Sequence, residues 1–108
     1  MYNNNIINNL KTICKEDTVF FKNQSKYAVA DGFSKVEFYI DEKKFSYRVS
    51  GDAYITAMTK WLQKCLINSN DLSLITLPYL IEYFGIPQHK VRNAMQIINI
   101  IKKINAKK

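Results

Sequence analysis

Five polar side chains with the chemistry of base recognition occur close together in this sequence: Gln88, His89, Arg92, Asn93 and Gln96. In a major groove, arginine can donate two hydrogen bonds to guanine, and asparagine or glutamine can bond to adenine in the same bidentate way. His89 and the neighbouring Lys90 suit phosphate oxygens. If one helix carries these side chains on one side, their chemistry predicts recognition of a nucleic acid.

Two short helices around a tight turn, over residues 76–96, are predicted to position these side chains. Gly85 ends the first helix, because glycine takes the left-handed conformation without a Cβ clash, and Ile86 can pack back on the helix that it leaves. Pro87 keeps Ile86 out of the α region and sets its own φ for entry into the second helix.

The first of these helices is predicted to begin at Thr76, whose hydroxyl can accept from a nearby backbone N–H, with Pro78 in its first turn. Apolar residues recur at helical spacing along one side of each helix. In the first helix they are Leu77, Leu80, Ile81 and Phe84. In the second they are Val91, Ala94, Met95 and Ile98, which predicts that the outward residues are Gln88, His89, Arg92, Asn93 and Gln96.

The segment from Gly85 to Met95, Gly-Ile-Pro-Gln-His-Lys-Val-Arg-Asn-Ala-Met, resembles the turn and recognition helix of winged-helix repressors in the helix-turn-helix family. The resemblance depends on the glycine, the apolar residue after it, and Val91 and Ala94. It implies a small sequence-specific DNA-binding protein, a transcriptional regulator, with its second helix in the major groove of double-stranded DNA. It also implies base contacts by the five outward residues and phosphate contacts by Thr76, Tyr79 and Lys90.

Two alternatives remain open. A helical hairpin with no role in DNA binding would show the same Gly-Ile-Pro turn between two amphipathic helices. A non-enzymatic interaction protein, such as an inhibitor, immunity or accessory factor, could cover an acidic protein partner with the same basic surface. Such a protein needs positive charge, but it does not need Arg92, Asn93 and Gln96 in one outward row.

The positive charge of the chain is concentrated in its second half. The formal net charge is +7; residues 1–52 hold eight basic and seven acidic side chains, whereas residues 53–108 hold eight basic and only two acidic ones. A general enrichment in lysine would raise the number of lysines in both halves, but it would not lower the number of acidic residues in one of them. A polyanion partner explains the asymmetry, and Lys102 and Lys103 are expected to contact its phosphates.

Length and composition predict one globular domain over residues 1–108, since 47% of the residues are hydrophobic. The longest apolar run is far shorter than the roughly 20 residues that cross a bilayer, and residues 1–5 lack the basic start of a signal peptide. We therefore expect no membrane contact and a cytoplasmic location. The two cysteines, Cys14 and Cys65, lack metal-site spacing and are expected to be reduced core residues.

The first part of the domain, residues 1–50, is predicted to combine a helix with a small antiparallel sheet. Ile6, Leu10, Ile13 and Cys14 share one side of a helix over residues 5–15. Alternating apolar and polar residues predict a hairpin whose strands are Val36–Ile40 and Phe45–Val49, joined by Asp41–Lys43. Earlier strands are expected at Val19–Phe21 and Tyr27–Ala30, with a turn at Asp31-Gly32. Aromatic residues of the hairpin could stack on single-stranded bases, although the alternation favours a core position for most of Phe38, Tyr39, Phe45 and Tyr47.

The second part, residues 51–108, is predicted to form a three-helix, helix-turn-helix core, so the expected fold class is α+β. Asp52 should cap its first helix. Leu72–Ile75 forms a connector or a short strand. The last helix should continue through Ile97, Ile98, Ile100, Ile101 and Ile104. This apolar face either packs on the sheet or forms the seam of a homodimer.

The sequence predicts no catalytic group, metal site or cofactor. His89 is the only histidine, and Gly32, Gly51 and Gly85 are too scattered to form a phosphate-binding loop. We therefore expect a protein that is not an enzyme. A cluster of Asp, Lys and Tyr side chains brought together by the fold stays open, because spacing along a sequence does not show it.

Overall fold

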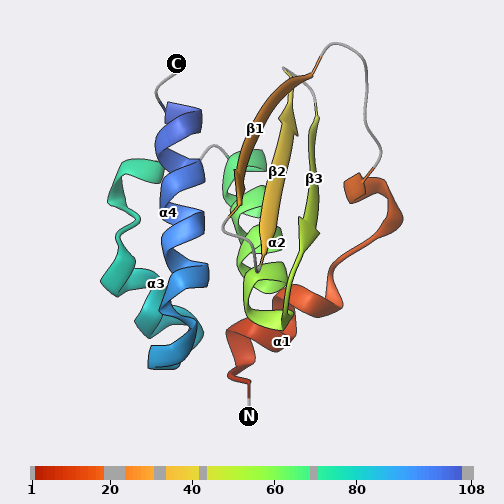
Figure 1. The fold of residues 1–108 in the computed structure, drawn as a ribbon. Coiled ribbons are helices and arrows are strands. Elements are labelled where there is room, and N and C mark those ends of the chain that lie inside the picture. The colour runs from red at the N-terminus through yellow and green to blue at the C-terminus, as the bar shows by residue number, and fades with distance from the viewer. Residues whose placement is uncertain (1, 19–23, 31–33, 42–43, 69–70, 106–108) are drawn as a thin grey trace.

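The structure is a computed structural model that describes residues 2–18, 24–30, 34–41, 44–68 and 71–105. It has an α+β fold, as predicted, with an N-terminal helix, a three-stranded antiparallel sheet and three further helices (Figure 1). The helices are α1 (Asn4–Lys11), α2 (Ala53–Ile67), α3 (Leu77–Phe84) and α4 (Val91–Asn105). The strands are β1 (Ser25–Ala30), β2 (Lys35–Ile40) and β3 (Phe45–Ser50). Short 3-10 turns are η1 (Lys15–Thr18), η2 (Leu72–Leu74) and η3 (Gln88–Lys90).

The sheet has the order β1-β2-β3, and its register explains how one face became apolar. Tyr27, Phe38 and Tyr47 pair across the three strands, and a second cross-strand row is formed by Val29, Val36 and Val49. Because side chains alternate between the two faces of a strand, both rows lie on the same face. Phe38 and Val36 are fully buried there. The hairpin predicted at residues 36–49 is confirmed as β2 and β3.

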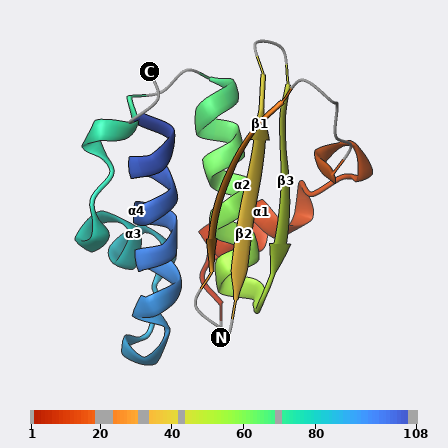
Figure 2. The same cartoon turned by 45° about the horizontal axis from the view of Figure 1, so that its top comes forward.

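Helices α2 and α4 cover this inner face. Figures 1 and 2 show α2 behind the sheet, α4 alongside β1, and α3 on the side of α4 that faces away from the sheet. The hydrophobic core is continuous from Ile6 in α1 to Ile104 in α4. It therefore joins the two parts of the chain.

The opposite face of the sheet, the open face, is not covered by any helix of the described residues in either view (Figures 1 and 2). Small and charged side chains make up this face. They are Lys26, Ala28, Ala30, Lys35, Glu37, Tyr39, Ser46, Arg48 and Ser50.

Residues from opposite ends of the chain meet where α1 packs on α3. The side-chain amides of Asn3 and Asn5 both donate to the carbonyl oxygen of Tyr83, at 3.0 and 2.6 Å. Asn3 also caps α1, since its side chain accepts from the amide of Ile6. The asparagines of this segment therefore satisfy one of the last carbonyls of α3, which has no partner within its own helix.

Local helix signals in the second half are confirmed. Asp52 accepts from the amide of Ile55 at the start of α2, and the Thr76 hydroxyl accepts from the amide of Tyr79 at the start of α3. Gly85 ends α3 in the left-handed conformation, with φ 61° and ψ 46°.

Two expectations for the connecting segments were wrong, and of the two forms left open for Leu72–Ile75 the structure has the connector. The first helix ends at Lys11, because Asp17 binds the amide of Cys14 and starts a separate 3-10 turn; Cys14 is consequently exposed rather than in the core. Cys65 is buried, as expected. Residues 72–75 hold the 3-10 turn η2 and not a strand, because the Asp71 carboxylate accepts from both the amide and the hydroxyl of Ser73.

Other expectations lie outside the described residues. They are the strand at Val19–Phe21, the turn at Asp31-Gly32, and most of the Asp41–Lys43 turn. Of the predicted early strands, Tyr27–Ala30 is confirmed as part of β1, which pairs with β2.

The C-terminal isoleucines pack inside the fold. Ile97, Ile100, Ile101 and Ile104 are buried and Ile98 is partly buried, against the sheet and the neighbouring helices. Of the two interpretations of this apolar face, packing on the sheet is the one found. Among the described residues, no helix combines the length and apolar character that crossing a membrane requires.

Candidate nucleic-acid interface

The turn between α3 and α4 has the geometry predicted from Gly-Ile-Pro. The amide of Ile86 donates to the carbonyl of Ile81 at 2.9 Å, and the Ile86 side chain packs into the core. This pattern is the usual result of a left-handed glycine at a helix end. Pro87 is extended, with ψ 156°, and its carbonyl accepts from the amide of Lys90. The chain then enters α4 through η3 rather than directly.

The predicted outward row of α4 was partly wrong. Asn93 and Gln96 are buried, with exposed fractions of 8% and 4%, whereas Met95, predicted to face inward, is exposed. The apolar stripe of α4 is centred on Ile97 and Ile100, and the positions four residues before them are Asn93 and Gln96. These two residues therefore lie on the inner face of the helix.

Both buried amides have partners in distant segments. The Asn93 side chain donates to both carboxylate oxygens of Asp52, at 3.0 and 3.2 Å. Gln96 accepts from the Ser34 hydroxyl at 2.6 Å and donates to the Ser34 carbonyl at 3.2 Å. These bonds attach α4 to the start of α2 and to the start of β2, so neither side chain is available to a base.

Lys90 is also used inside the protein. Its amine lies 2.6 Å from the Asp52 carboxylate, so Asp52 caps α2 and binds both Lys90 and Asn93. Burial raises the pKa of Asp52, but the bonds from Lys90, the Ile55 amide and Asn93 outweigh this effect and lower it. The hydrogen bond to the Asp52 carboxylate raises the pKa of Lys90.

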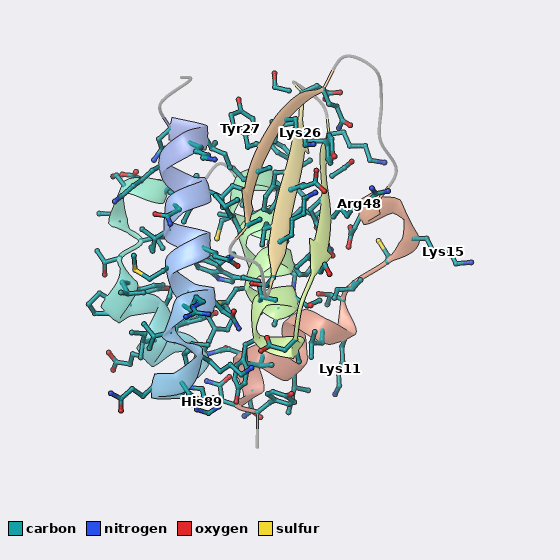
Figure 3. The ribbon with its side chains drawn as sticks, in the orientation of Figure 1. Lys11, Lys15, Lys26, Tyr27, Arg48 and His89 are labelled. Carbon is teal, nitrogen blue, oxygen red and sulfur yellow. The ribbon has the colours of Figure 1, made fainter. Side chains whose placement is uncertain are left out.

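The solvent-facing side chains of η3 and α4 form a second row, here called the exposed stripe. It consists of Gln88, His89, Arg92, Met95, Asn99, Lys102 and Lys103. Residues 88–105 contain no acidic side chain. The Lys103 amine donates to the carbonyl of Ala28 in β1, at 2.5 Å, so the stripe reaches the edge of the sheet. His89 marks its other end in Figure 3.

A hollow of about 390 Å³ lies at the start of α4. It is lined by Gln88, His89, Lys90, Arg92 and Asn93. The structure thus gathers half of the predicted site residues at this one place, although Lys90 and Asn93 bind the Asp52 carboxylate.

The predicted phosphate contacts on α3 lie on its outer side. Thr76 is exposed while its hydroxyl caps the helix. Tyr79 is 44% exposed, and its ring stacks on Tyr83 at a centroid distance of 5.6 Å. Trp61 of α2 contacts both rings, so α3 presents an aromatic cluster beside its first turn.

The structure contains a buried polar cluster whose residues the sequence did not predict as a group. Asp17 in η1 accepts from the Tyr47 hydroxyl at 3.0 Å, from the Lys60 amine at 2.9 Å and from the Gln63 amide at 3.1 Å. The exposed Cys14 thiol donates to the same carboxylate at 3.4 Å. Lys60 is 43 residues from Asp17 in the sequence, and no local signal connects it to η1.

Hydrogen bonding keeps the Asp17 carboxylate ionised. Burial raises the pKa of Asp17, but bonds from Lys60, the Cys14 amide, Gln63 and Tyr47 lower it to about 2. Burial and the Asp17 charge raise the pKa of Tyr47. Lys60 additionally donates to Gln63, and Gln63 donates to the carbonyl of Phe45. The cluster therefore connects η1, β3 and α2 in the manner of a buried structural ion pair.

Among the described residues, no three His, Cys, Asp or Glu side chains are grouped as a metal site requires. Comparison with known proteins adds no identification: no family model, curated protein or solved structure matches the chain.

Proposed function

We propose that the protein is a small sequence-specific DNA-binding protein, a transcriptional regulator acting in the cytoplasm, that inserts the exposed stripe of α4 into a major groove. The observation that supports this proposal is the stripe itself, which carries basic and amide side chains and no acid. Such side chains suit both base edges and phosphates. A resemblance to helix-turn-helix proteins in the segment 85–95 supports the same function.

The proposed roles differ from those in the predicted row. Gln88, Arg92 and Asn99 contact base edges, and Met95 suits the methyl group of thymine. From Arg92 to Asn99 the helix rises about 10 Å, which fits within a groove about 12 Å wide. Phosphate contacts come from His89, Lys102 and Lys103, and from Thr76 and Tyr79 on α3.

The buried amides then have a supporting role in this proposal. Asn93 and Gln96 fix the rotation of α4 about its axis, and Lys90 fixes its start against Asp52. A binding helix whose rotation is fixed presents the same side chains to every site, which is what sequence preference requires.

Selection from a random duplex pool, followed by fluorescence anisotropy across a salt series, tests the proposal. We expect an enriched motif and an affinity that falls steeply with salt. Arg92→Ala and Asn99→Ala should each relax preference at one position and weaken binding by about 1–3 kcal/mol. Asn8→Ala, at an exposed asparagine of α1, is the matched control and should bind like wild type.

Either of two results would overturn the proposal: binding without an enriched motif, or binding that does not depend on salt. A duplex titration in low salt without any binding would do the same.

A protein partner is the second candidate function, and the aromatic cluster of α3 favours it. Tyr79 and Trp61 are types enriched at protein interfaces, and Leu74 in η2 is 75% exposed. In this case a purified complex should contain one stoichiometric acidic protein and survive nuclease treatment. Tyr79→Ala should then weaken that complex. Arg92→Ala and Asn8→Ala should bind the protein partner as tightly as wild type does.

A further inference from the structure

The open face of the sheet carries a buried acid surrounded by cations. The Glu37 carboxylate lies 2.8 Å from the Lys26 amine and 3.5 Å from the Lys35 amine, and it accepts from the Tyr39 hydroxyl at 3.0 Å. Arg48 is its cross-strand neighbour on β3. The Glu37 side chain is only 4% exposed, whereas those of Lys26 and Lys35 are 55% and 54% exposed.

This arrangement places positive charge at the surface of the open face and negative charge beneath it. The hydrogen bond from Lys26 holds the pKa of Glu37 below its usual value, and the same bond raises the pKa of Lys26. Glu37 and Lys26 are therefore both charged near neutral pH. Among the described residues, the strands of the open face carry three cations and one acid that solvent barely reaches.

The other described residues of the open face are uncharged. Its remaining side chains are small or lie along the sheet: Ala28, Ala30, Ser46 and Ser50 are small, and the Tyr39 ring lies under the Lys26 amine, 5.9 Å from its centroid. Because Lys26 covers the ring, Tyr39 is not a stacking platform for bases. The surface suits a partner that offers charge rather than rings.

The spacing of the cations fits the phosphates along a nucleic-acid strand. From strand separation and residue rise, the backbone positions of Lys35, Arg48 and Lys26 lie about 8–14 Å apart. A DNA strand carries one phosphate about every 3.4 Å along the duplex axis, so one strand can meet all three. Figure 3 shows Lys26 and Arg48 arising from the two outer strands of the sheet.

The open face is also continuous with the exposed stripe. Lys103 of α4 donates to the carbonyl of Ala28, which belongs to β1 and to the open face. Lys102 and Lys103, at the end of the exposed stripe that makes this contact, are both basic.

We propose that the open face binds the phosphates of a nucleic-acid strand that continues from the DNA held by α4, with Lys26, Lys35 and Arg48 as contacts and Glu37 as the group that the phosphates displace. This inference takes from the proposed function only the class of partner. It adds a second surface, and it assigns Glu37 the role of a built-in competitor that weakens binding.

Charge-removal variants test the contacts. Lys35→Gln and Arg48→Gln should each lower the salt slope of duplex binding by about 0.9, the value for one lost phosphate contact. The enriched motif should stay the same, because base contacts lie on α4. Lys11→Gln is the matched control: it removes one charge from an exposed position on α1 and should leave the slope unchanged.

Glu37→Gln tests whether Glu37 competes with phosphates for Lys26 and Lys35. The amide keeps the size of the side chain and can accept from Tyr39, but it releases Lys26 and Lys35 for phosphates. We expect affinity to rise about two- to fivefold in low salt, the factor that corresponds to a surface ion pair. A gain in affinity is not a result that partial unfolding produces, and a thermal melt of each variant checks the fold.

The outcomes separate the two proposals. If Lys35→Gln and Arg48→Gln match Lys11→Gln, or if Glu37→Gln does not bind more tightly, the open-face inference is overturned while the function of α4 stands. If the open-face variants lower the slope but no motif is enriched, the proposed function fails and the inference stands. If wild-type protein binds no nucleic acid, both fail.

Discussion

Gln96 and Arg92 lie one turn apart on α4 and have opposite surroundings. Gln96 is buried and exchanges two hydrogen bonds with Ser34, whereas Arg92 is exposed. Gln96→Ala leaves the polar atoms of Ser34 buried without this partner, so we expect a loss of about 1–3 kcal/mol in the free energy of unfolding. Arg92→Ala should change it by less than about 0.5 kcal/mol. Urea unfolding followed by circular dichroism measures both.

DNA binding provides the complementary measurement for this pair. Folded Gln96→Ala protein should keep the wild-type motif, while Arg92→Ala should not. If Gln96→Ala is as stable as wild type but loses its motif, Gln96 contacts a base and the inward assignment is wrong.

Asp17 is the residue on which the buried polar cluster depends. Asp17→Asn removes the charge that pairs with Lys60 and leaves a buried cation, so we expect a loss of about 3–5 kcal/mol in the free energy of unfolding. Asp71→Asn, at an exposed carboxylate that caps η2, is the matched control and should lose about 1 kcal/mol or less. Equal effects in urea unfolding would contradict the buried ion pair.

The same residue predicts the response to acid. The pKa of Asp17 is about 2 in the folded protein, below the unfolded value of about 3.9. A depressed pKa contributes stability that is complete above about pH 4 and is lost as the pH falls through about 2. Melting temperatures of wild type should therefore fall steeply over this window, and those of Asp17→Asn should fall less.

At the level of single residues, the sequence correctly predicted the roles of side chains that interact with residues only a few positions away. Thr76, Gly85 and Asp52 were assigned correctly because a cap depends on the residues next to it. Asn93 was misassigned because its partner is Asp52, 41 residues away. Polar residues are predicted to face water unless a partner is known, and the partner here is supplied by tertiary structure.

The elements show a related limit. The inner face of α4 was predicted from Val91, Met95 and Ile98, which all lie within the regular α-helix, whereas the buried stripe is centred on Ile97 and Ile100. The prediction followed the apolar residues nearest the turn and not the longer run of isoleucines after them. Counting backward from the isoleucines would have found the correct inner face, because Ile97 and Ile100 lead to Asn93 and Gln96.

Strands were predicted more reliably than helix faces. In β2 and β3 the period of two leaves little ambiguity, and both strands were found within one residue of the predicted ends. The open face was not predicted as a site, since Lys26, Lys35 and Arg48 are distant in sequence and meet only through the register of the sheet.

On the scale of the whole molecule, the packing of α4 changes the expectation of a homodimer. A dimer seam was one of the two interpretations of the C-terminal isoleucines, yet Ile100 and Ile101 are buried within one chain. The structure does not test the oligomeric state. It removes this reason for a dimer, because the predicted seam is already covered.

Sedimentation equilibrium at micromolar concentration should therefore give a monomer mass. Ile100→Asn should unfold the protein rather than dissociate it, with a loss of several kcal/mol, because a polar group replaces a fully buried side chain. Met95→Asn, at an exposed position of the same helix, is the control and should stay folded. If the wild type is a dimer and Ile101→Asn converts it to folded monomers, the prediction of a dimer seam is supported.

The contacts of Asn3 and Asn5 with Tyr83 have a consequence for biosynthesis. The ribosome releases α1 first, yet α1 finds its partner carbonyl only about 80 residues later, and β1 is synthesised about 60 to 80 residues before the α4 residues that cover its apolar face. At about 5–20 residues per second, the nascent sheet and α2 spend several seconds with this face uncovered. Closure of the core is thus a late event in synthesis, and during that interval the growing chain has the exposed apolar surface that chaperones bind.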